Sequence, residues 1–220
     1  MVTPTAVLFD LDGTLADTAP DLGGALNRLR VEEGLPVLPL QQLRPHASAG
    51  ARGLIGEGFG MTKDDLRYTD LQARFLALYE QHICDETRLF PGMEDVLDQL
   101  EQRCIKWGVV TNKHARFTTP LMDALGLARR AACVISGDTA ARSKPDPAPL
   151  LMACSQAGID PGNAIYVGDD ERDVQAGRAA RMRTVIAAWG YCFGAPIETW
   201  GGDVIIHQPA EVIRLLDRAW

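Results

Sequence analysis

An apolar run that ends in two aspartates constrains this chain more than any other segment. Residues 6–9 are apolar, Asp10 and Asp12 follow with one residue between them, and Gly13 comes next. A short apolar run closed by turn residues is typical of a strand covered on both faces of a parallel sheet. Alternate strand residues point to the same side, so both carboxylates would leave the strand end together. Two anions this close are tolerated only with a bound cation, a shared proton or full solvation.

Two interpretations of this segment are open from its residues alone. A divalent metal beside a phosphate group would neutralise the paired carboxylates. The alternative is ordinary turn chemistry, in which aspartate accepts hydrogen bonds from nearby backbone amides and glycine supplies a positive φ. A short motif has a substantial false-positive risk, so the rest of the chain must decide.

The composition is that of a globular protein, with 46% hydrophobic and 23% charged residues in a chain of 220. This length allows one domain, or one domain with a small insert, around a substantial core. The net charge of −7 argues against nucleic acid or an anionic membrane as the main partner, because both bind basic patches.

The N-terminal residues indicate a cytoplasmic protein. Residues 1–5 include no Lys or Arg, and the apolar stretch that follows is too short for a signal or membrane helix. The five cysteines are scattered and show no CxxC spacing, so the sequence predicts neither a disulfide framework nor a zinc site.

Short apolar segments alternate with segments of helical spacing along most of the chain. After the opening strand, the predicted strands are Ile105–Val110, Ala132–Ile135, Ala164–Val167, Thr184–Ala188 and Val204–Ile206. The predicted helices are Met93–Arg103, Phe117–Leu125, Pro147–Ala157, Arg172–Ala180 and Pro209–Arg218. This alternation predicts an α/β fold, a Rossmann-like doubly wound parallel sheet with helices on both faces.

The segment from Asp17 to Asp85 breaks the alternation. It shows helical patterns at Asp21–Glu33 and Asp64–Ile83, a glycine-rich passage between them, and no convincing strand. Thr18 and Asp21 resemble a helix-start pair, although Glu or Gln is the usual partner in a capping box. The sequence thus predicts a core of residues 1–16 and 86–220 with an inserted α-helical cap domain at 17–85.

Polar residues follow the predicted strands at the points where the strands end. In open parallel sheets, ligands bind outside the carboxyl ends of the strands, so these residues would share one edge. They are Asp10 and Asp12, Thr111-Asn112-Lys113, Ser136-Gly137-Asp138, Lys144-Pro145-Asp146-Pro147, and Gly168-Asp169-Asp170 with Asp173.

Four of these segments, in this order, resemble the motifs of the haloacid dehalogenase superfamily, specifically of its phosphatases with a helical cap. They are Asp10-Leu-Asp12-Gly-Thr14, Thr111-Asn112, Lys144-Pro145 and Gly168-Asp169-Asp170-Glu-Arg-Asp173. The similarity extends over essentially the whole chain, including the position of the cap. The resemblance implies a phosphomonoester hydrolase that acts on a small-molecule phosphate ester, as a monomer or a homodimer.

By this resemblance, Asp10 is the nucleophile that forms an aspartyl phosphate, and Asp12 is the general acid and then the general base. Dehalogenases of the superfamily lack the second acid, so Asp12 favours phosphate esters. Lys144 would neutralise charge on the nucleophile and the phosphoryl group, while Thr111 and Asn112 would bind phosphate oxygens. Taken alone, Thr-Asn after a strand is common turn chemistry, and a lysine is usually exposed.

The resemblance also implies Mg²⁺, which prefers octahedral oxygen ligation. The Asp10 carboxylate, the Asp12 backbone carbonyl and Asp169 would be its protein ligands. Asp173 is expected outside the ring of direct ligands, and Asp170 is equally open to the simpler interpretation of a helix cap.

Residues 45–56, which are mostly small and include one arginine, are expected to select the leaving group. Arg52 would bind a carboxylate and Ser48 would add a hydrogen bond. The alternative is that the glycines shape a turn between helices while Arg52 faces water. The roles of His46 and His114 stay open, with a solvated side chain as the default.

Two branches of the superfamily match this chain. Phosphoglycolate phosphatases share the four motifs and the cap type, and their small dianionic substrate suits Arg52. Residues 108–113, 167–173, 189–191 and 200–203 look especially like the phosphatases of N-acetylmuramic acid 6-phosphate. We favour the phosphoglycolate phosphatase class and keep the amino-sugar phosphate as the specific alternative.

Two rival functions share the same motifs. A β-phosphoglucomutase-like transferase would use Asp10 and Asp12 but pass the phosphoryl group to a sugar. A regulatory or binding domain without activity would keep only the fold. The full set of acids with Lys144 argues against this second rival, because a binding domain needs no nucleophile.

Arg181 departs from the pattern of similar sequences, which commonly have glycine there. It follows residues 176–180, which look like the end of a helix. If the backbone is left-handed at this position, arginine costs about 1 kcal/mol relative to glycine.

Overall fold

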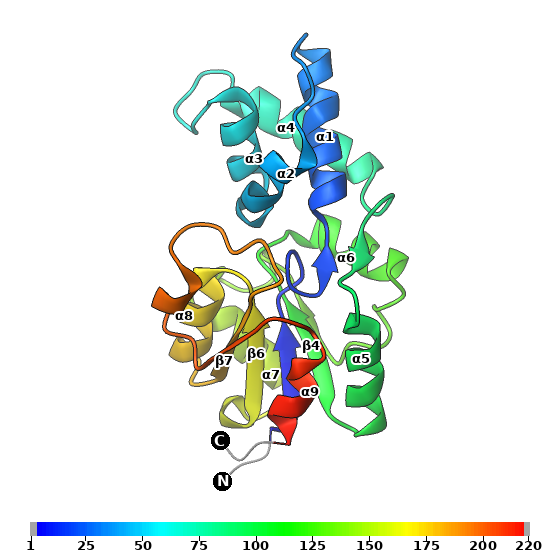
Figure 1. Cartoon of the computed structure of the whole chain (residues 1–220), viewed down its shortest axis with the longest axis vertical. Coiled ribbons are helices and arrows are strands. Elements are labelled where there is room, and N and C mark those ends of the chain that lie inside the picture. The colour runs from blue at the N-terminus through cyan, green and yellow to red at the C-terminus, as the bar shows by residue number, and fades with distance from the viewer. Residues whose placement is uncertain (1–3, 218–220) are drawn as a thin grey trace.

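The protein is built on a sheet of six parallel strands in the order β5-β4-β1-β6-β7-β8. The structure, a computed structural model, describes residues 4–217 (Figure 1). The strands are β1 Ala6–Phe9, β4 Lys106–Val110, β5 Val134–Ile135, β6 Ala164–Gly168, β7 Arg183–Ala187 and β8 Val204–Ile206. Each of the five strands predicted after β1 is present, with its ends within two residues of the prediction.

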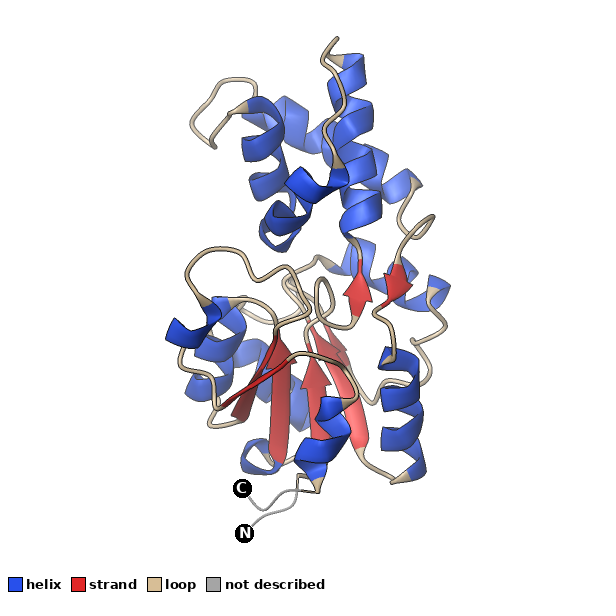
Figure 2. Ribbon diagram, viewed as in Figure 1, coloured by secondary structure: helices blue, strands red, loops and turns tan. Residues whose placement is uncertain are grey.

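Helices cover both faces of this sheet (Figure 2). The helices of the core are α5 Met93–Gln102, α6 Ala115–Ala124, α7 Ala148–Ala157, α8 Glu171–Ala179 and α9 Glu211–Leu216, with short 3₁₀ turns η2 Pro161–Asn163 and η3 Ile197–Thr199. They confirm the predicted doubly wound α/β class. The prediction that ended the last helix at Arg218 falls, at that residue, outside the described residues.

The central strand β1 shows why its sequence is an unbroken apolar run. Val7 and Phe9 join the apolar cluster that contains the buried faces of α5 and α9. Ala6 and Leu8 pack on the opposite face, in the cluster that contains residues of α7 and α8. Successive strand residues point to opposite faces, so a strand covered on both sides needs apolar residues throughout.

A second group of helices stands over the carboxyl ends of the strands (Figures 1 and 2). It contains α1 Ala19–Glu32, α2 Leu40–Leu43, the 3₁₀ helix η1 Arg44–Ala49, α3 Gly50–Phe59 and α4 Tyr68–Gln81. Their apolar side chains form a cluster of their own, to which a few core residues also belong. These helices lie within the predicted cap segment 17–85, and the exact domain boundaries stay a prediction. None of the helices between residues 4 and 217 is long and apolar enough to cross a bilayer.

The glycine-rich passage of the cap is helical, which the sequence did not predict. It forms η1 and then α3, and the next helix, α4, begins at Tyr68 rather than at Asp64. The glycines serve close packing: a β-carbon at Gly58 would lie 2.9 Å from Leu26 of α1. Tertiary packing therefore outweighs the low helix propensity of glycine at this position.

The two linkers between the core and the cap pair with each other. β2 (Ala16–Asp17) and β3 (Arg88–Leu89) form an antiparallel ribbon, too short to show any periodicity in the sequence. The Asp21 carboxylate accepts hydrogen bonds from the backbone N–H and the hydroxyl of Thr87. Thr18 precedes α1 but its hydroxyl does not cap the helix. The helix begins where the predicted helix-start pair placed it, but the two side chains bind elsewhere and form no capping box.

Helix ends bear out the expectation for Arg181. Its φ is 60°, immediately after the end of α8, and the backbone N–H of Met182 binds the carbonyl of Gly177. Gly126 and Gly158 have the same left-handed conformation after α6 and α7. Arg181 therefore stands in a position that favours glycine.

Candidate active site

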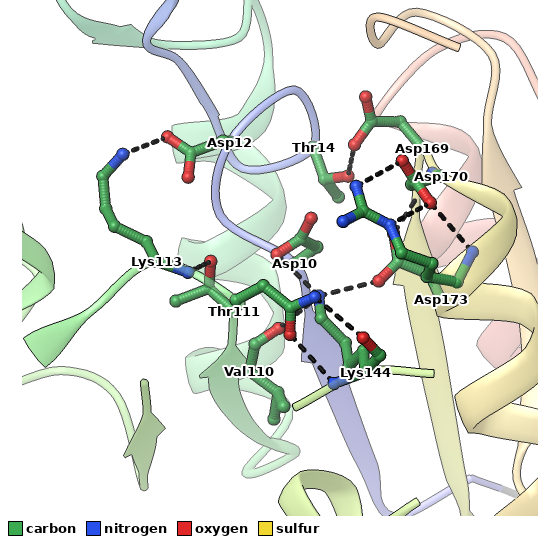
Figure 3. A network of polar contacts seen from close by, with 12 residues as sticks. Asp10, Asp12, Thr14, Val110, Thr111, Lys113, Lys144, Asp169, Asp170 and Asp173 are labelled. Atoms are coloured by element: carbon green, nitrogen blue, oxygen red, sulfur yellow. Dashed lines mark hydrogen bonds and ion pairs between the residues drawn. The ribbon is translucent and has the colours of Figure 1, made fainter. Parts of the chain in front are cut away.

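Many of the polar residues predicted to share an edge meet at the floor of a pocket between the sheet and the cap, whereas Gly137, Asp138, Pro145 and Asp146 line a separate hollow. The pocket has a volume of about 530 Å³. From the core it is lined by Asp10, Asp12, Thr111, Asn112, Lys113, Lys144, Asp170, Arg172 and Asp173, and from the cap by Ser48 and Arg52 among others. Figure 3 shows the polar contacts of this floor.

Asp10 is the buried anion at the centre of the site. Its Oδ1 atom forms an ion pair with the Lys144 ammonium at 2.9 Å and has no other hydrogen-bond donor within residues 4–217. The Lys144 ammonium also donates hydrogen bonds to the Val110 carbonyl, the Tyr166 hydroxyl and the Asp173 carboxylate. Burial raises the pKa of Asp10 to about 7, and Lys144 offsets only part of that rise. One buried cation, Lys144, thus compensates the charge of the Asp10 carboxylate.

Lys144 is held in place by its own backbone as well as its ammonium. The Asn112 side chain accepts a hydrogen bond from the Lys144 N–H and donates one to the Lys144 carbonyl, both at 2.9 Å. Burial alone would lower the pKa of Lys144, but Asp10 and Asp173 outweigh it and raise that pKa. Lys144 is therefore a permanent cation. Asn112 uses both ends of its amide to position this lysine, and its contact with phosphate stays a prediction.

Three carboxylates form a cluster suited to a metal ion. Oxygen atoms of Asp10, Asp169 and Asp173 lie within 4.8 Å of one another. Asp169 accepts hydrogen bonds at 2.8 Å from the Thr14 hydroxyl and the Tyr191 N–H. Burial raises the pKa of Asp169 well above its usual range, and the charge of Asp10 adds to this.

Glycines make room for Asp169. A β-carbon at Gly13, where φ is +84°, would lie 2.2 Å from an oxygen of Asp169. A β-carbon at Gly190 would lie 2.3 Å from the β-carbon of the same residue. The glycine of the first motif therefore serves close packing beside the acids as well as a turn.

Asp170 and Asp173 belong to the start of α8. They form a reciprocal capping box, and Asp170 also accepts two hydrogen bonds from the Arg172 guanidinium at 2.7 Å. Burial would raise the pKa of Asp170, but Arg172 outweighs it and lowers that pKa. The structure thus places Asp170 as a helix cap. It brings Asp173 into the acidic cluster, where Lys144 and Tyr166 bind its Oδ1 atom.

The donor set fits the implied Mg²⁺. All three groups are carboxylates, which this ion prefers, and Asp10 Oδ1 has no donor other than Lys144 within the described residues. Asp10 and Asp169 are the natural direct ligands. Both oxygens of Asp173 are already engaged by protein donors, which favours its expected position outside the ring of ligands.

Asp12 points away from Asp10, toward the linker and Lys113 (Figure 3). Its Oδ1 atom accepts hydrogen bonds from the Thr18 hydroxyl at 2.6 Å and from Lys113 at 2.8 Å. Lys113 is buried, and its ammonium lies 4.8 Å from the centre of the Tyr79 ring of the cap. The sequence placed Lys113 at the strand end but assigned it no role, since a lysine after a turn carries no local signal.

Thr111 lies where the prediction put it, buried at the end of β4 and lining the pocket. Its hydroxyl oxygen accepts the backbone N–H of Lys113 at 3.1 Å, which leaves the hydroxyl proton available. The geometry is compatible with donation to a phosphate oxygen.

The cap supplies Ser48 and Arg52 to the same pocket. The Ser48 hydroxyl lies 3.5 Å from an Asp169 carboxylate oxygen, at the limit of a hydrogen bond. The backbone carbonyl of Ser48 accepts a hydrogen bond from the Arg172 guanidinium at 2.9 Å. Arg52 is exposed and forms no ion pair with any residue between 4 and 217. His46 contacts Glu57 at 3.2 Å, and His114 lies 3.6 Å from Asp138 and also lines the pocket.

Sequence reasoning missed two residues that position the site. Tyr191 binds Asp169 through its N–H, and its hydroxyl accepts the backbone N–H groups of Thr18 and Ala19. The Trp189 indole donates to the Thr14 carbonyl at 3.0 Å. The only sequence signal for these two residues was the segment Trp189-Gly190-Tyr191, which resembled one branch of the superfamily but did not indicate that either side chain contacts the site.

Comparisons with known proteins agree with this geometry. A model of the haloacid dehalogenase-like hydrolases matches residues 7–187. N-acetylmuramic acid 6-phosphate phosphatase of Pseudomonas aeruginosa is 43% identical over 215 residues, covering 97% of this chain and 95% of that protein. Phosphoglycolate phosphatase of Xanthomonas campestris pv. campestris is 43% identical over 211 residues, covering 95% of each.

A solved structure is similar along the whole length. It is a predicted phosphoglycolate phosphatase from Haemophilus somnus, with a TM-score of 0.85 and 26% identity, covering 98% of this chain and 99% of that chain. The resemblance inferred from the four motifs is therefore confirmed. With a family match over residues 7–187 and relatives at 43% identity along nearly the whole chain, this protein belongs to the haloacid dehalogenase-like hydrolase family.

Proposed function

We propose that this protein, a hydrolase of phosphate esters, works through an aspartyl phosphate on Asp10 and uses Mg²⁺. One observation carries the proposal: the Asp10 carboxylate is buried at the pocket floor, and Lys144, 2.9 Å from Oδ1, is the only donor to that oxygen within residues 4–217. A single buried cation compensates the charge of the carboxylate, and one of its two oxygens stays available as a nucleophile.

The reaction divides into two displacements. In the first, an Asp10 oxygen forms a bond to phosphorus as the bond from phosphorus to the leaving alcohol breaks, and Asp12 gives its proton to that alcohol. In the second, water attacks the phosphorus, Asp12 takes up a proton from this water, and the bond to Asp10 breaks to release inorganic phosphate. Lys144 and the Thr111 hydroxyl would stabilise the charge on the phosphoryl oxygens.

Mg²⁺ bound by Asp10 and Asp169 would neutralise phosphoryl charge during both displacements. The Asp12 backbone carbonyl is the third protein ligand that we propose. Thr14 and the Tyr191 N–H hold Asp169 in place, and such partners orient a ligand and tune its affinity for the metal.

Asp12 must change partners before it acts as an acid. Its Oδ1 atom accepts hydrogen bonds from Lys113 and Thr18, and the side chain points away from Asp10. Entry of the ester must therefore draw the Asp12 side chain toward the leaving oxygen.

The substrate class is a small anionic phosphate ester. The phosphoglycolate phosphatase of Xanthomonas and the N-acetylmuramic acid 6-phosphate phosphatase of Pseudomonas are equally identical to this chain, at 43%. We keep phosphoglycolate phosphatase-like hydrolysis as the general assignment, with the amino-sugar phosphate as the specific alternative.

The direct test measures phosphate release from a panel of phosphate esters with and without Mg²⁺. We expect turnover that EDTA abolishes and that Asp10→Asn lacks, and mass spectrometry of acid-quenched enzyme should find the phosphoryl group on Asp10. Interconversion of sugar phosphates without free phosphate would instead establish a β-phosphoglucomutase-like transferase. Inactivity across the whole panel would favour a binding or regulatory domain.

A further inference from the structure

Tyr191 lies in the loop after β7, in the core, but its side chain packs with the cap. The Tyr191 ring is 7% exposed and joins the apolar cluster of the cap helices. A β-carbon at Gly13 would lie 2.8 Å from this ring, so the ring also rests against the loop that carries the first motif. Tyr191 thus stands where the first motif, the loop after β7 and the cap meet.

The phenol oxygen of Tyr191 makes its hydrogen bonds with the start of the cap. It accepts the backbone N–H groups of Thr18 at 2.9 Å and of Ala19 at 2.8 Å. Its own proton is within reach of Asp17 Oδ1, at 3.1 Å. A hydroxyl has two lone pairs and one proton, so these three contacts use its full capacity. Both amides belong to the N-terminus of α1, where backbone donors have no partner within the helix.

The Tyr191 contacts leave the Thr18 hydroxyl available to Asp12. Thr18 occupies the N-cap position of α1, where a threonine hydroxyl ordinarily caps its own helix, yet it makes no such bond. It donates instead to Asp12 Oδ1 at 2.6 Å. The Tyr191 hydroxyl satisfies the first amides of the helix from the core, and one of these amides is that of Thr18 itself. Tyr191 therefore fixes the backbone of the residue that binds the Asp12 side chain.

The backbone of Tyr191 is anchored beside the acids. Its N–H donates to Asp169 Oδ2 at 2.8 Å. A β-carbon at the preceding Gly190 would lie 2.3 Å from the β-carbon of Asp169 and 2.4 Å from the Gly13 carbonyl oxygen. The chain is therefore packed against both motifs, and a side chain anchored in this way can hold the start of α1 at a fixed position relative to the acids.

We propose that Tyr191 is a positioning residue for proton transfer, and that it acts on Asp12 through Thr18. The inference rests on the proposed function, in which Asp12 gives a proton to the leaving alcohol. Without the Tyr191 hydroxyl, two buried amides of α1 lose their acceptor, and the backbone at Thr18 shifts to find another. Asp12 then loses its defined place relative to the leaving oxygen. Asp10 is held by Lys144, so nucleophilic attack keeps its geometry.

Two esters of similar size separate proton transfer from attack on phosphorus. Benzyl phosphate releases an alkoxide that needs a proton, whereas p-nitrophenyl phosphate releases a stabilised phenolate that does not. In Tyr191→Phe, which keeps the N–H that binds Asp169, we expect kcat/KM for benzyl phosphate to fall about 5- to 20-fold. The kcat/KM for p-nitrophenyl phosphate, which reports the first displacement, should change by less than about threefold.

Variants of Thr18 test the route from Tyr191 to Asp12. Thr18→Val removes the hydroxyl that binds Asp12 and should give the same selective loss, whereas Thr18→Ser keeps a hydroxyl and should retain most of the activity on benzyl phosphate. Because Tyr191 acts through Thr18, adding Tyr191→Phe to Thr18→Val should lower kcat/KM for benzyl phosphate by no more than about threefold further.

Thr184→Val is the matched control for a loss of stability alone. The Thr184 hydroxyl is buried near the amino end of β7, at the opposite edge of the sheet from the site, and donates to Asp203 at 3.0 Å. Thr184→Val and Tyr191→Phe should each lower the Tm by about 2–6 °C in calorimetry. Thr184→Val should keep the wild-type ratio of kcat/KM for the two esters.

Equal losses on the two esters in Tyr191→Phe, or independent multiplication of the Tyr191→Phe and Thr18→Val effects, would reduce Tyr191 to a structural role and overturn the inference. Asp12→Asn distinguishes this outcome from failure of the proposed function. If Asp12→Asn loses activity selectively on benzyl phosphate and Tyr191→Phe does not, the inference alone is wrong. If Asp12→Asn shows no such selectivity, or the wild type releases no phosphate from any ester, the proposed function fails and the inference fails with it.

Discussion

Competition between protons and Mg²⁺ at Asp10 should make metal binding steeply dependent on pH. Burial raises the pKa of Asp10 to about 7, and Lys144 offsets only part of the rise. A metal takes the deprotonated carboxylate, so a proton must leave before Mg²⁺ binds. Acidification from pH 8 to pH 5 should therefore weaken the apparent affinity about 100-fold, equivalent to about 2.7 kcal/mol. The pKa of Asp169 is raised as well, which makes this factor a minimum.

Whereas the affinity for Mg²⁺ should rise with pH, the stability of the metal-free protein should fall as the pH rises. Because the pKa of Asp10 is about 7 in the folded chain and 3.8 in the reference state, folding takes up a proton between those values. The contribution of Asp10 to stability is then greatest at the acidic end of this window and is lost as the pH rises through about 7. Added Mg²⁺ should reverse that trend, because it stabilises the deprotonated cluster.

Thermal unfolding measured across a Mg²⁺ titration at pH 5, 6, 7 and 8 gives the apparent dissociation constant at each pH. Asp64→Asn, which removes an exposed acid of the loop before α4, is the matched control and should follow the wild type. A dissociation constant that changes less than about threefold over this range would refute the raised pKa and the assignment of Asp10 as a ligand.

Three further results are expected. Lys144→Met should lower kcat by at least about 100-fold and destabilise the protein by about 3–5 kcal/mol, because Asp10 and Asp173 would lose their buried counter-ion. Steady-state kinetics measures the loss of kcat, and urea unfolding measures the loss of stability. Asp12→Asn should release p-nitrophenol from p-nitrophenyl phosphate in a burst followed by slow turnover, since this leaving group needs no proton but the phosphoenzyme still needs a base; stopped-flow absorbance shows the burst. Arg181→Gly should stabilise the protein by about 1 kcal/mol and raise Tm by about 2–4 °C, while Gly126→Ala, at an equivalent helix end, should lower Tm by a similar amount in calorimetry.

The sequence predicts those parts of the site that follow from strand ends. Asp10, Thr111 and Asp169 each come directly after a strand, and parallel strands deliver their carboxyl ends to one edge. Periodicity was enough to place them together. Lys144 could be included only through the resemblance, since it lies in a loop whose path no local pattern describes.

The contacts that hold the site could not be predicted, because they join residues distant in the chain. The Asn112 amide binds backbone groups 32 positions away, and the Tyr191 hydroxyl binds the start of α1, 172 and 173 positions away. An amide after a strand is equally consistent with phosphate binding and with structural support. The contact with the Lys144 backbone shows the structural support, which the sequence could not indicate.

Asp10 and Asp12 are held by different parts of the molecule, and this difference connects the cap to the chemistry. Asp10 is bound within the core. Lys144 lies beside the Asp10 carboxylate, and the backbone N–H of Asp10 donates to the Val167 carbonyl. Asp12 is bound by Thr18, at the entrance to the cap, and by Lys113, on which a tyrosine ring of α4 rests. A displacement of the cap would therefore alter the contacts of Asp12, the proposed acid–base residue, more directly than those of Asp10, the proposed nucleophile. Under the proposed mechanism, this arrangement links proton transfer to the position of the cap.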